Sequence, residues 1–151
     1  MDPAGAIILI TVIGILTVAS YYFVFSKLFT IKIGLIASFL YAVLLNGVQL
    51  DRRVVPSTPT NIWVIWYFYT IVNILRGNYS VLPILGILIG LIWHIHIALL
   101  PALIAIPAAL LISRKLPTKK EIFAFLIALL ITSLPLIVFE TRHNFQQTSN
   151  L

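Results

Sequence analysis

Long apolar runs, separated by short stretches rich in proline, asparagine and basic residues, make up most of the chain. A helix needs about 20 mainly apolar residues to cross the hydrocarbon core of a bilayer. The pattern therefore predicts an all-α fold, a polytopic transmembrane helix bundle that forms a single domain over residues 1–151. The expected spans are residues 6–25, 33–48, 61–75, 81–97, 99–113 and 121–139.

Two of these spans come from dividing one long apolar run, residues 81–113. As one helix the run would reach roughly 50 Å, which is too long for a single crossing. Pro101 lies near its middle and removes a helix hydrogen bond, so we divide the run between residues 97 and 99 into two helices. The glycines of "GILIG", at Gly86 and Gly90, predict close packing of one helix on another. We expect an aromatic belt at the membrane interface, formed by Trp63, Trp66, Tyr67 and Tyr69.

The composition indicates that the chain is not dissolved in water. Of its 151 residues 61% are hydrophobic and 9% are charged, whereas soluble domains carry about 25% charged residues. We therefore expect an integral membrane protein, and the net charge of +6 then reports orientation rather than a nucleic-acid partner. The absence of cysteine excludes a disulfide framework and thiolate chemistry.

The basic residues divide unequally between the two sides of the predicted bundle. Three fall on one side, at Arg52, Arg53 and Arg142. Seven fall on the other side: Lys27, Lys32, Arg76, Arg114, Lys115, Lys119 and Lys120. Because Lys and Arg accumulate in cytoplasmic loops, the seven predict the cytoplasmic side. Both termini are then extracytoplasmic, and the expected location is the plasma (inner) membrane.

Polar side chains that could form a site fall on the predicted outer side. Such groups near membrane depth are costly and usually serve a function. His94 and His96 are two residues apart and point to nearly opposite helix faces. Glu140 and His143 share a face in an E-x-x-H pattern, which admits a divalent metal without defining a metal site. The candidates are Arg52, Arg53, His96, Glu140, Arg142 and His143. The simpler interpretation is a set of independent anchors at the headgroups.

Three stretches are informative together: "DRRVVPSTPTNIWVIWYF", "LGILIGLIWHIHIALLPAL" and "SLPLIVFETRHNFQQT". In this order they resemble the multispanning membrane glycosyltransferases of the GT-C superfamily, which includes protein mannosyltransferases and lipid A sugar transferases. The resemblance implies transfer of a sugar from a polyprenyl-phosphate donor to a glycan, lipid or protein acceptor outside the cytoplasm. It also implies that the arginines bind the donor phosphate, and that His96, Glu140 and His143 bind hydroxyl groups.

The catalytic acid of such enzymes lies in the first extracytoplasmic loop, and the resemblance implies that this chain begins after that loop. We therefore assign no catalytic residue and expect an internal fragment that is inactive alone. Two other classes stay open. One is a small multispanning transporter or flippase component, in which the His and Glu side chains would line a pathway. The other is a structural membrane subunit without a site.

Overall fold

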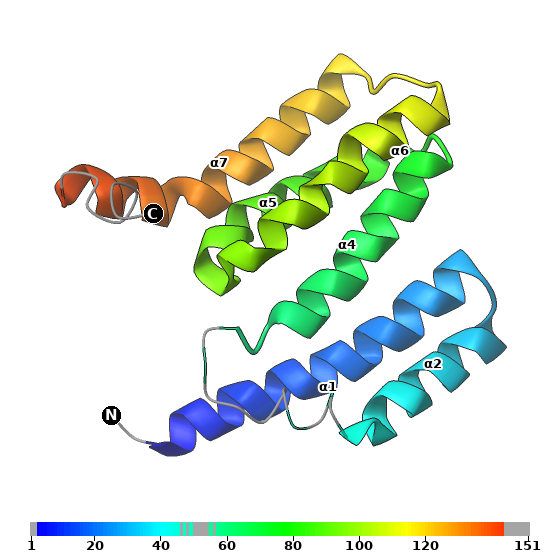
Figure 1. Ribbon diagram of the computed structural model, residues 1–151, viewed down its shortest axis with the longest axis vertical. Coiled ribbons are helices and arrows are strands. Elements are labelled where there is room, and N and C mark those ends of the chain that lie inside the picture. The colour runs from blue at the N-terminus through cyan, green and yellow to red at the C-terminus, as the bar shows by residue number, and fades with distance from the viewer. Residues whose placement is uncertain (1–2, 46, 48, 50–54, 56, 144–151) are drawn as a thin grey trace.

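The structure, a computed structural model, describes residues 3–45, 47, 49, 55 and 57–143. Within these residues the protein contains only helices, six of them α-helices and two of them 3₁₀-helices (Figure 1). The elements are α1 (Pro3–Leu28), α2 (Ile31–Val43), α4 (Thr60–Leu75), η1 (Tyr79–Val81), α5 (Leu82–Ile95), η2 (Ile97–Ile104), α6 (Ala105–Ser113) and α7 (Lys119–Arg142). The all-α prediction is confirmed, and helical structure lies at each of the six expected places.

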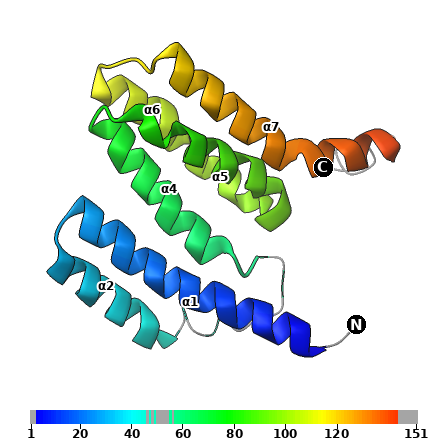
Figure 2. The same cartoon turned by 180° about the vertical axis from the view of Figure 1, so that it is seen from behind.

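Successive helices run back and forth, and α4 lies between the α1–α2 hairpin and the group formed by α5, α6 and α7 (Figures 1 and 2). The turns that join α1 to α2, α4 to α5 and α6 to α7 lie at one end. The start of α1, the α5–η2 junction and the end of α7 lie at the opposite end (Figure 1). The alternation expected from the apolar runs is therefore present in the fold.

Two helices are long and apolar enough to cross a membrane by length and composition, at Ala4–Leu28 and Lys119–Arg142. The remaining apolar helices are shorter, between 10 and 17 residues. Large apolar side chains lie exposed on both long helices; Ile15, for example, is 64% exposed and Ile131 is 65% exposed. These two helices bear out a possible membrane association, and the six crossings stay a prediction.

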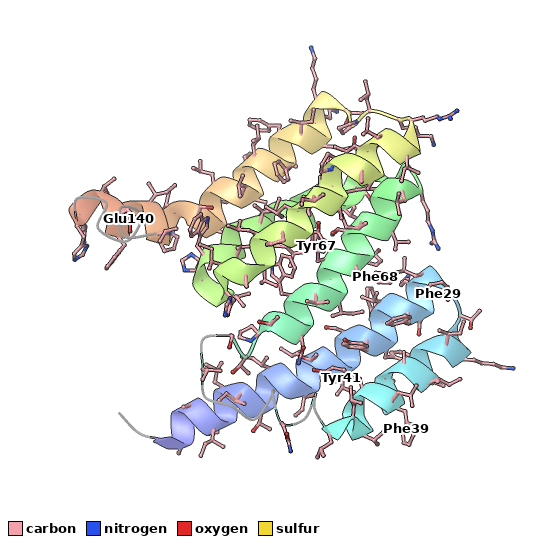
Figure 3. All side chains as sticks on the ribbon, viewed as in Figure 1. Phe29, Phe39, Tyr41, Tyr67, Phe68 and Glu140 are labelled. Carbon is pink, nitrogen blue, oxygen red and sulfur yellow. The ribbon has the colours of Figure 1, made fainter. Side chains whose placement is uncertain are left out.

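Aromatic residues of α4 form the centre of the core between α4, α5 and α6. The Trp63 ring stacks on the Tyr67 ring with centroids 4.8 Å apart. The Trp63 indole Nε1 donates a hydrogen bond to the Leu88 carbonyl of α5 at 2.7 Å. Only 2% of Trp63 and 8% of Tyr67 are exposed. The prediction of an interfacial belt is therefore wrong for these two residues, because they are buried in the bundle. Figure 3 shows Tyr67 among the helices. Trp66 and Tyr69 are only partly buried, and for them the belt stays a prediction.

The α1–α2 hairpin packs on α4 through small and aromatic residues. The Tyr21 and Tyr41 rings stack between α1 and α2, 4.2 Å apart. The Trp66 indole Nε1 of α4 donates to the Ser20 hydroxyl of α1 at 3.1 Å. A tryptophan thus ties α4 to each of its neighbouring groups, Trp63 to α5 and Trp66 to α1.

The two glycines of "GILIG" face α7, as the sequence predicts. A Cβ atom at Gly86 would lie 2.5 Å from the Phe125 carbonyl oxygen, and one at Gly90 would lie 2.9 Å from the Thr132 Cβ. Real Cβ atoms do not approach other atoms so closely, so α5 and α7 pack in near-backbone contact because these positions carry no side chain.

The break in the long apolar run lies at His96, two residues before the expected division between residues 97 and 99. His96 has an extended backbone (φ −166°, ψ 124°) between α5 and η2. Its Nδ1 accepts a hydrogen bond from the Ala98 N–H at 3.1 Å and so starts the next helix. Pro101 lies inside η2, and the expected helix over 99–113 is 3₁₀ in its first part and α from Ala105.

Helix α7 extends beyond its expected bounds of 121–139 at both ends. Thr118 and Glu121 form a capping box that starts the helix at Lys119. Pro135 lies inside the helix and removes a backbone hydrogen bond, which bends helices. Figure 1 shows that the second half of α7 changes direction, so that its end projects away from α5.

Candidate functional site

The candidate residues that the structure describes lie at one end of the bundle, which we call the histidine end and define by His96, Glu140, Arg142 and His143. His96 is exposed at the α5–η2 junction. Its Nδ1 is engaged in the cap of η2, which leaves Nε2 as the ring nitrogen directed away from that bond. His94, two residues earlier, is exposed in the last turn of α5.

The other three candidates lie in the final turn of α7 and just after it. Glu140 is buried, with 5% of its surface exposed. Arg142 is exposed in the last turn. The His143 ring stacks on Phe139 with centroids 4.1 Å apart, and its Nδ1 lies 2.9 Å from the Phe139 carbonyl oxygen. Phe139 therefore fixes the imidazole beside the end of the helix, with Glu140 one turn before it.

The structure brings these residues to the same end but divides them between two elements. Glu140 lies on the part of α7 that projects beyond the rest of the bundle (Figure 3). Each imidazole is held within its own segment, His96 by Ala98 and His143 by Phe139. The candidates Arg52 and Arg53 lie outside the described residues.

The E-x-x-H pair at Glu140 and His143 does not gain a third ligand from the described part of the chain. Among those residues, no group of three His, Asp or Glu side chains is placed to hold a metal ion. The pair alone supplies at most two ligands, whereas metal sites in bundles combine such pairs from several helices. The geometry therefore defines no metal centre here.

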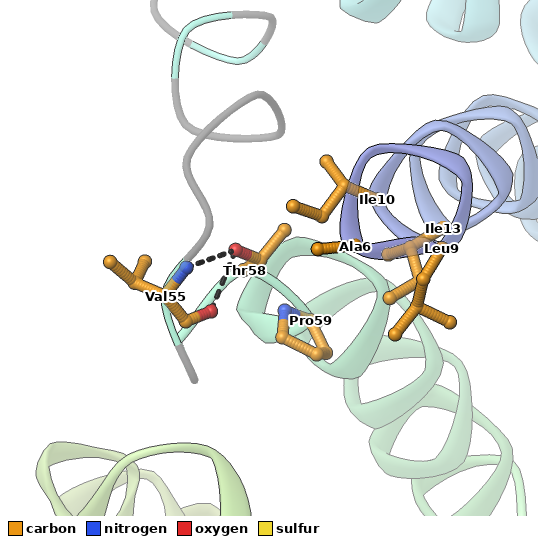
Figure 4. Close-up of a pocket in the computed structure, with 7 residues that line it drawn as sticks. All are labelled: Ala6, Leu9, Ile10, Ile13, Val55, Thr58 and Pro59. Carbon is orange, nitrogen blue, oxygen red and sulfur yellow. Dashed lines mark hydrogen bonds between the residues drawn. The ribbon is translucent and has the colours of Figure 1, made fainter. Parts of the chain in front are cut away.

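An apolar groove of about 320 Å³ opens near the start of α1, beside the segment that leads into α4 (Figure 4). Its lining residues are Ala6, Leu9, Ile10, Ile13, Val55, Thr58 and Pro59. The segment is held by Thr58, whose hydroxyl donates to the Val55 carbonyl at 2.8 Å and whose N–H donates to the same oxygen at 3.0 Å. Because these polar atoms bond to one another, Val55, Thr58 and Pro59 contribute mainly carbon atoms to the groove.

Sequence reasoning missed this groove. The "PSTPT" stretch signals a turn through its proline, serine and threonine residues, but a turn signal does not show which surface the turn faces. The opposite wall consists of residues spaced three and four apart on α1, which is the face that any apolar helix would offer. Nothing in the sequence indicates that these two surfaces meet.

Comparison of the chain with protein families, with curated proteins and with solved structures gives no match.

Proposed function

We propose that this chain is part of an integral membrane glycosyltransferase that moves a sugar from a polyprenyl-phosphate donor to an acceptor outside the cytoplasm. The observation that carries the proposal is the separation of chemistry between the two ends of the bundle. His96, Glu140, Arg142 and the apolar groove lie at one end, and the lysine-rich turns lie at the other (Figure 1). A lipid-linked donor needs both a polar and an apolar surface on one side of the bilayer.

Helix geometry supports more than two crossings. The elements η2 and α6 together contain 17 residues, fewer than the 20 or so of a typical span. A 3₁₀-helix rises about 2.0 Å per residue and an α-helix 1.5 Å, so η2 and α6 together reach about 30 Å. This length equals the hydrocarbon thickness of a typical bilayer. The 3₁₀ segment thus lengthens this short helix to the length of one further crossing.

The chemistry of transfer assigns a role to the arginine. When the sugar–phosphate bond breaks, negative charge grows on the leaving phosphate, and fixed donors stabilise it. The Arg142 guanidinium is exposed at the end of α7, and its planar fork matches two phosphate oxygens at once. The groove beside α1 offers a surface for part of the isoprenoid chain. His96 and His143 are placed to hydrogen-bond sugar or acceptor hydroxyls, and the catalytic base is left unassigned.

Binding of a polyprenyl phosphate to the detergent-solubilised chain tests the proposal. A phosphate fork does not tolerate lysine, because an ammonium group is a point charge without bidentate geometry. Loss of one charge-assisted contact costs about 1.5–3 kcal/mol, which is roughly a tenfold to hundredfold loss of affinity. We therefore expect Arg142→Lys to weaken binding of polyprenyl phosphate by that factor and to leave binding of the uncharged polyprenol unchanged.

The matched control is Arg114→Lys, an arginine after the last residue of α6 at the other end of the bundle. It should bind polyprenyl phosphate as the unaltered chain does. Equal affinity in the chain and in Arg142→Lys would reduce Arg142 to a headgroup anchor, because either side chain reaches the headgroups. In the protein that contains this segment, Arg142→Lys should also lower sugar transfer from a labelled donor while membrane insertion stays unchanged.

A further inference from the structure

The end of the bundle opposite the groove carries a concentrated positive charge. We call it the basic end and define it by Lys27, Lys32, Arg76, Arg114, Lys115, Lys119 and Lys120. All seven side chains are exposed. The described residues contain two carboxylates, and Glu140 lies at the histidine end. Glu121 is therefore the single described carboxylate at the basic end.

Hydrogen bonds hold the turns of this end together. The Arg76 Nη2 at the end of α4 donates to the Leu28 carbonyl at the end of α1, at 2.9 Å. The Tyr79 hydroxyl donates to the Lys115 carbonyl at 2.6 Å. The stem of Lys115 covers Gly77, where a Cβ atom would lie 2.6 Å from the Lys115 Cδ. The Lys115 side chain thus lies against the turn at Gly77, directly after Arg76, so the fold brings these two basic residues to the same turn.

The one carboxylate does not neutralise these cations. The Glu121 Oε2 accepts hydrogen bonds from the Thr118 N–H and hydroxyl, both at 2.7 Å, within the capping box. Lys119 and Lys120 occupy the first turn of α7, where the helix dipole is positive and disfavours cations. Glu121 lies in the same turn, and its single negative charge offsets only part of the cost of the two lysines.

Exposed apolar side chains lie among these cations. Leu116, next to Lys115, is 89% exposed, Ile112 is 68% exposed and Phe29 is 51% exposed. A dissolved anion needs only cations around it. A phospholipid needs cations that bind its phosphate and apolar side chains that contact its acyl chains. The combination indicates a membrane surface of negative charge.

We propose that the basic end binds the headgroups of anionic phospholipids, with the phosphates held chiefly by Arg76, Lys115, Lys119 and Lys120. Leu116 and Phe29 contact the acyl chains of the same lipids. The site is separate from the proposed donor site, which lies at the histidine end. Failure of either proposal therefore leaves the other standing.

Native mass spectrometry of the chain in an uncharged detergent tests the proposal, with short-chain phosphatidylglycerol as the probe and phosphatidylcholine as the neutral reference. The main variant is Lys119→Gln with Lys120→Gln. It removes two exposed cations from the wrong end of the helix dipole, so it should not unfold the chain. Each lost charge corresponds to about 1 kcal/mol at an anionic surface, or about fivefold in affinity. We expect phosphatidylglycerol to bind about 25-fold more weakly and phosphatidylcholine to bind as before.

A second variant, Arg114→Gln with Lys115→Gln, tests the neighbouring turn and should also weaken phosphatidylglycerol binding at least fivefold. Lys119→Arg with Lys120→Arg keeps both charges and should change it less than twofold, because the charges attract the anionic lipid. Unchanged binding in both double glutamine variants, or an equal loss in the double arginine variant, would overturn the proposal. Full displacement of the lipid by inorganic phosphate at equal concentration would also overturn it, since the site would then select a dissolved anion.

Discussion

Gly86 of α5 lies directly against the backbone of Phe125 in α7, so close that a Cβ atom at position 86 would stand 2.5 Å from the Phe125 carbonyl oxygen and 3.1 Å from the Leu129 nitrogen. Both neighbours are backbone atoms, which cannot rotate away as the end of a side chain can. The contact between the two helices therefore depends on the absence of a single methyl group.

Substitution of Gly86 by alanine should separate the two helices. Overpacking of this kind typically costs about 1–3 kcal/mol, and we expect the free energy of unfolding in detergent micelles to fall by that amount. Gly5→Ala is the matched control, because a Cβ atom there meets nothing within 4 Å. It should be neutral or stabilise α1 by up to about 1 kcal/mol. A Gly86→Ala chain as stable as the control would show that α7 does not pack on α5 as described.

Tyr67→Phe should weaken the junction between α4 and η2. The Tyr67 hydroxyl donates to the Ala102 carbonyl at 2.5 Å, and a lost hydrogen bond of this type costs about 0.5–1.5 kcal/mol. Tyr69→Phe removes a hydroxyl that has no hydrogen bond to another described residue, so it should change the stability much less. Thermal unfolding of the two variants side by side measures the difference, and equal effects would contradict the proposed junction.

His96 allows its structural role to be separated from any role in binding. His96→Ala removes the acceptor for the Ala98 N–H and should cost about 1 kcal/mol, as the loss of other helix caps does. His96→Asn supplies a side-chain oxygen in its place and should restore most of that stability. If His96 also binds the donor, the asparagine variant will be stable yet bind polyprenyl phosphate more weakly than the unaltered chain. Equal binding would leave His96 as a cap alone.

The predicted orientation is testable because the chain contains no cysteine. Val55 and Leu116 lie at opposite ends of the bundle and are 44% and 89% exposed. In intact cells a membrane-impermeant thiol reagent should label Val55→Cys and should label Leu116→Cys only after the membrane is opened. The reverse pattern would invert the orientation, and labelling of both in intact cells would exclude the alternating arrangement.

The positions of the helices could be predicted from the apolar runs, whereas several of their ends could not. The apolar run predicts a start of α7 at Glu121, whereas the helix begins at Lys119. The spacing of Thr118 and Glu121 is a capping-box signature, and this local signal marks the observed start. The 3₁₀ geometry of η2 has no comparable local signal, since the Tyr67–Ala102 hydrogen bond links residues 35 positions apart.

The candidate site was predictable only in part. Alternation of the helices brings His96 and Arg142 to the same end, as expected from the number of residues in each run. The sequence does not show that the end of α7, with Arg142, projects away from the α5–η2 junction, with His96. That arrangement depends on the direction in which α7 bends near Pro135. Trp63 shows the same limit, since a tryptophan suits a membrane interface and a buried core equally well. In the structure the Trp63 indole bonds the Leu88 carbonyl of α5, and this partner places Trp63 in the core.

The pairing of α5 with α7, with α6 between them in sequence, has a consequence for synthesis. The partner of Gly90 is Thr132, which leaves the ribosome on the order of 40 residues later. Protein synthesis adds about 5–20 residues per second. The glycine face of α5 is therefore without its partner helix for roughly 2–8 seconds. During that interval another helix, from a second copy or from a neighbouring membrane protein, could occupy it. Faithful assembly of this bundle therefore depends on how quickly α7 follows, and slowing of translation between Ser113 and Thr132 should raise the fraction of misassembled chains.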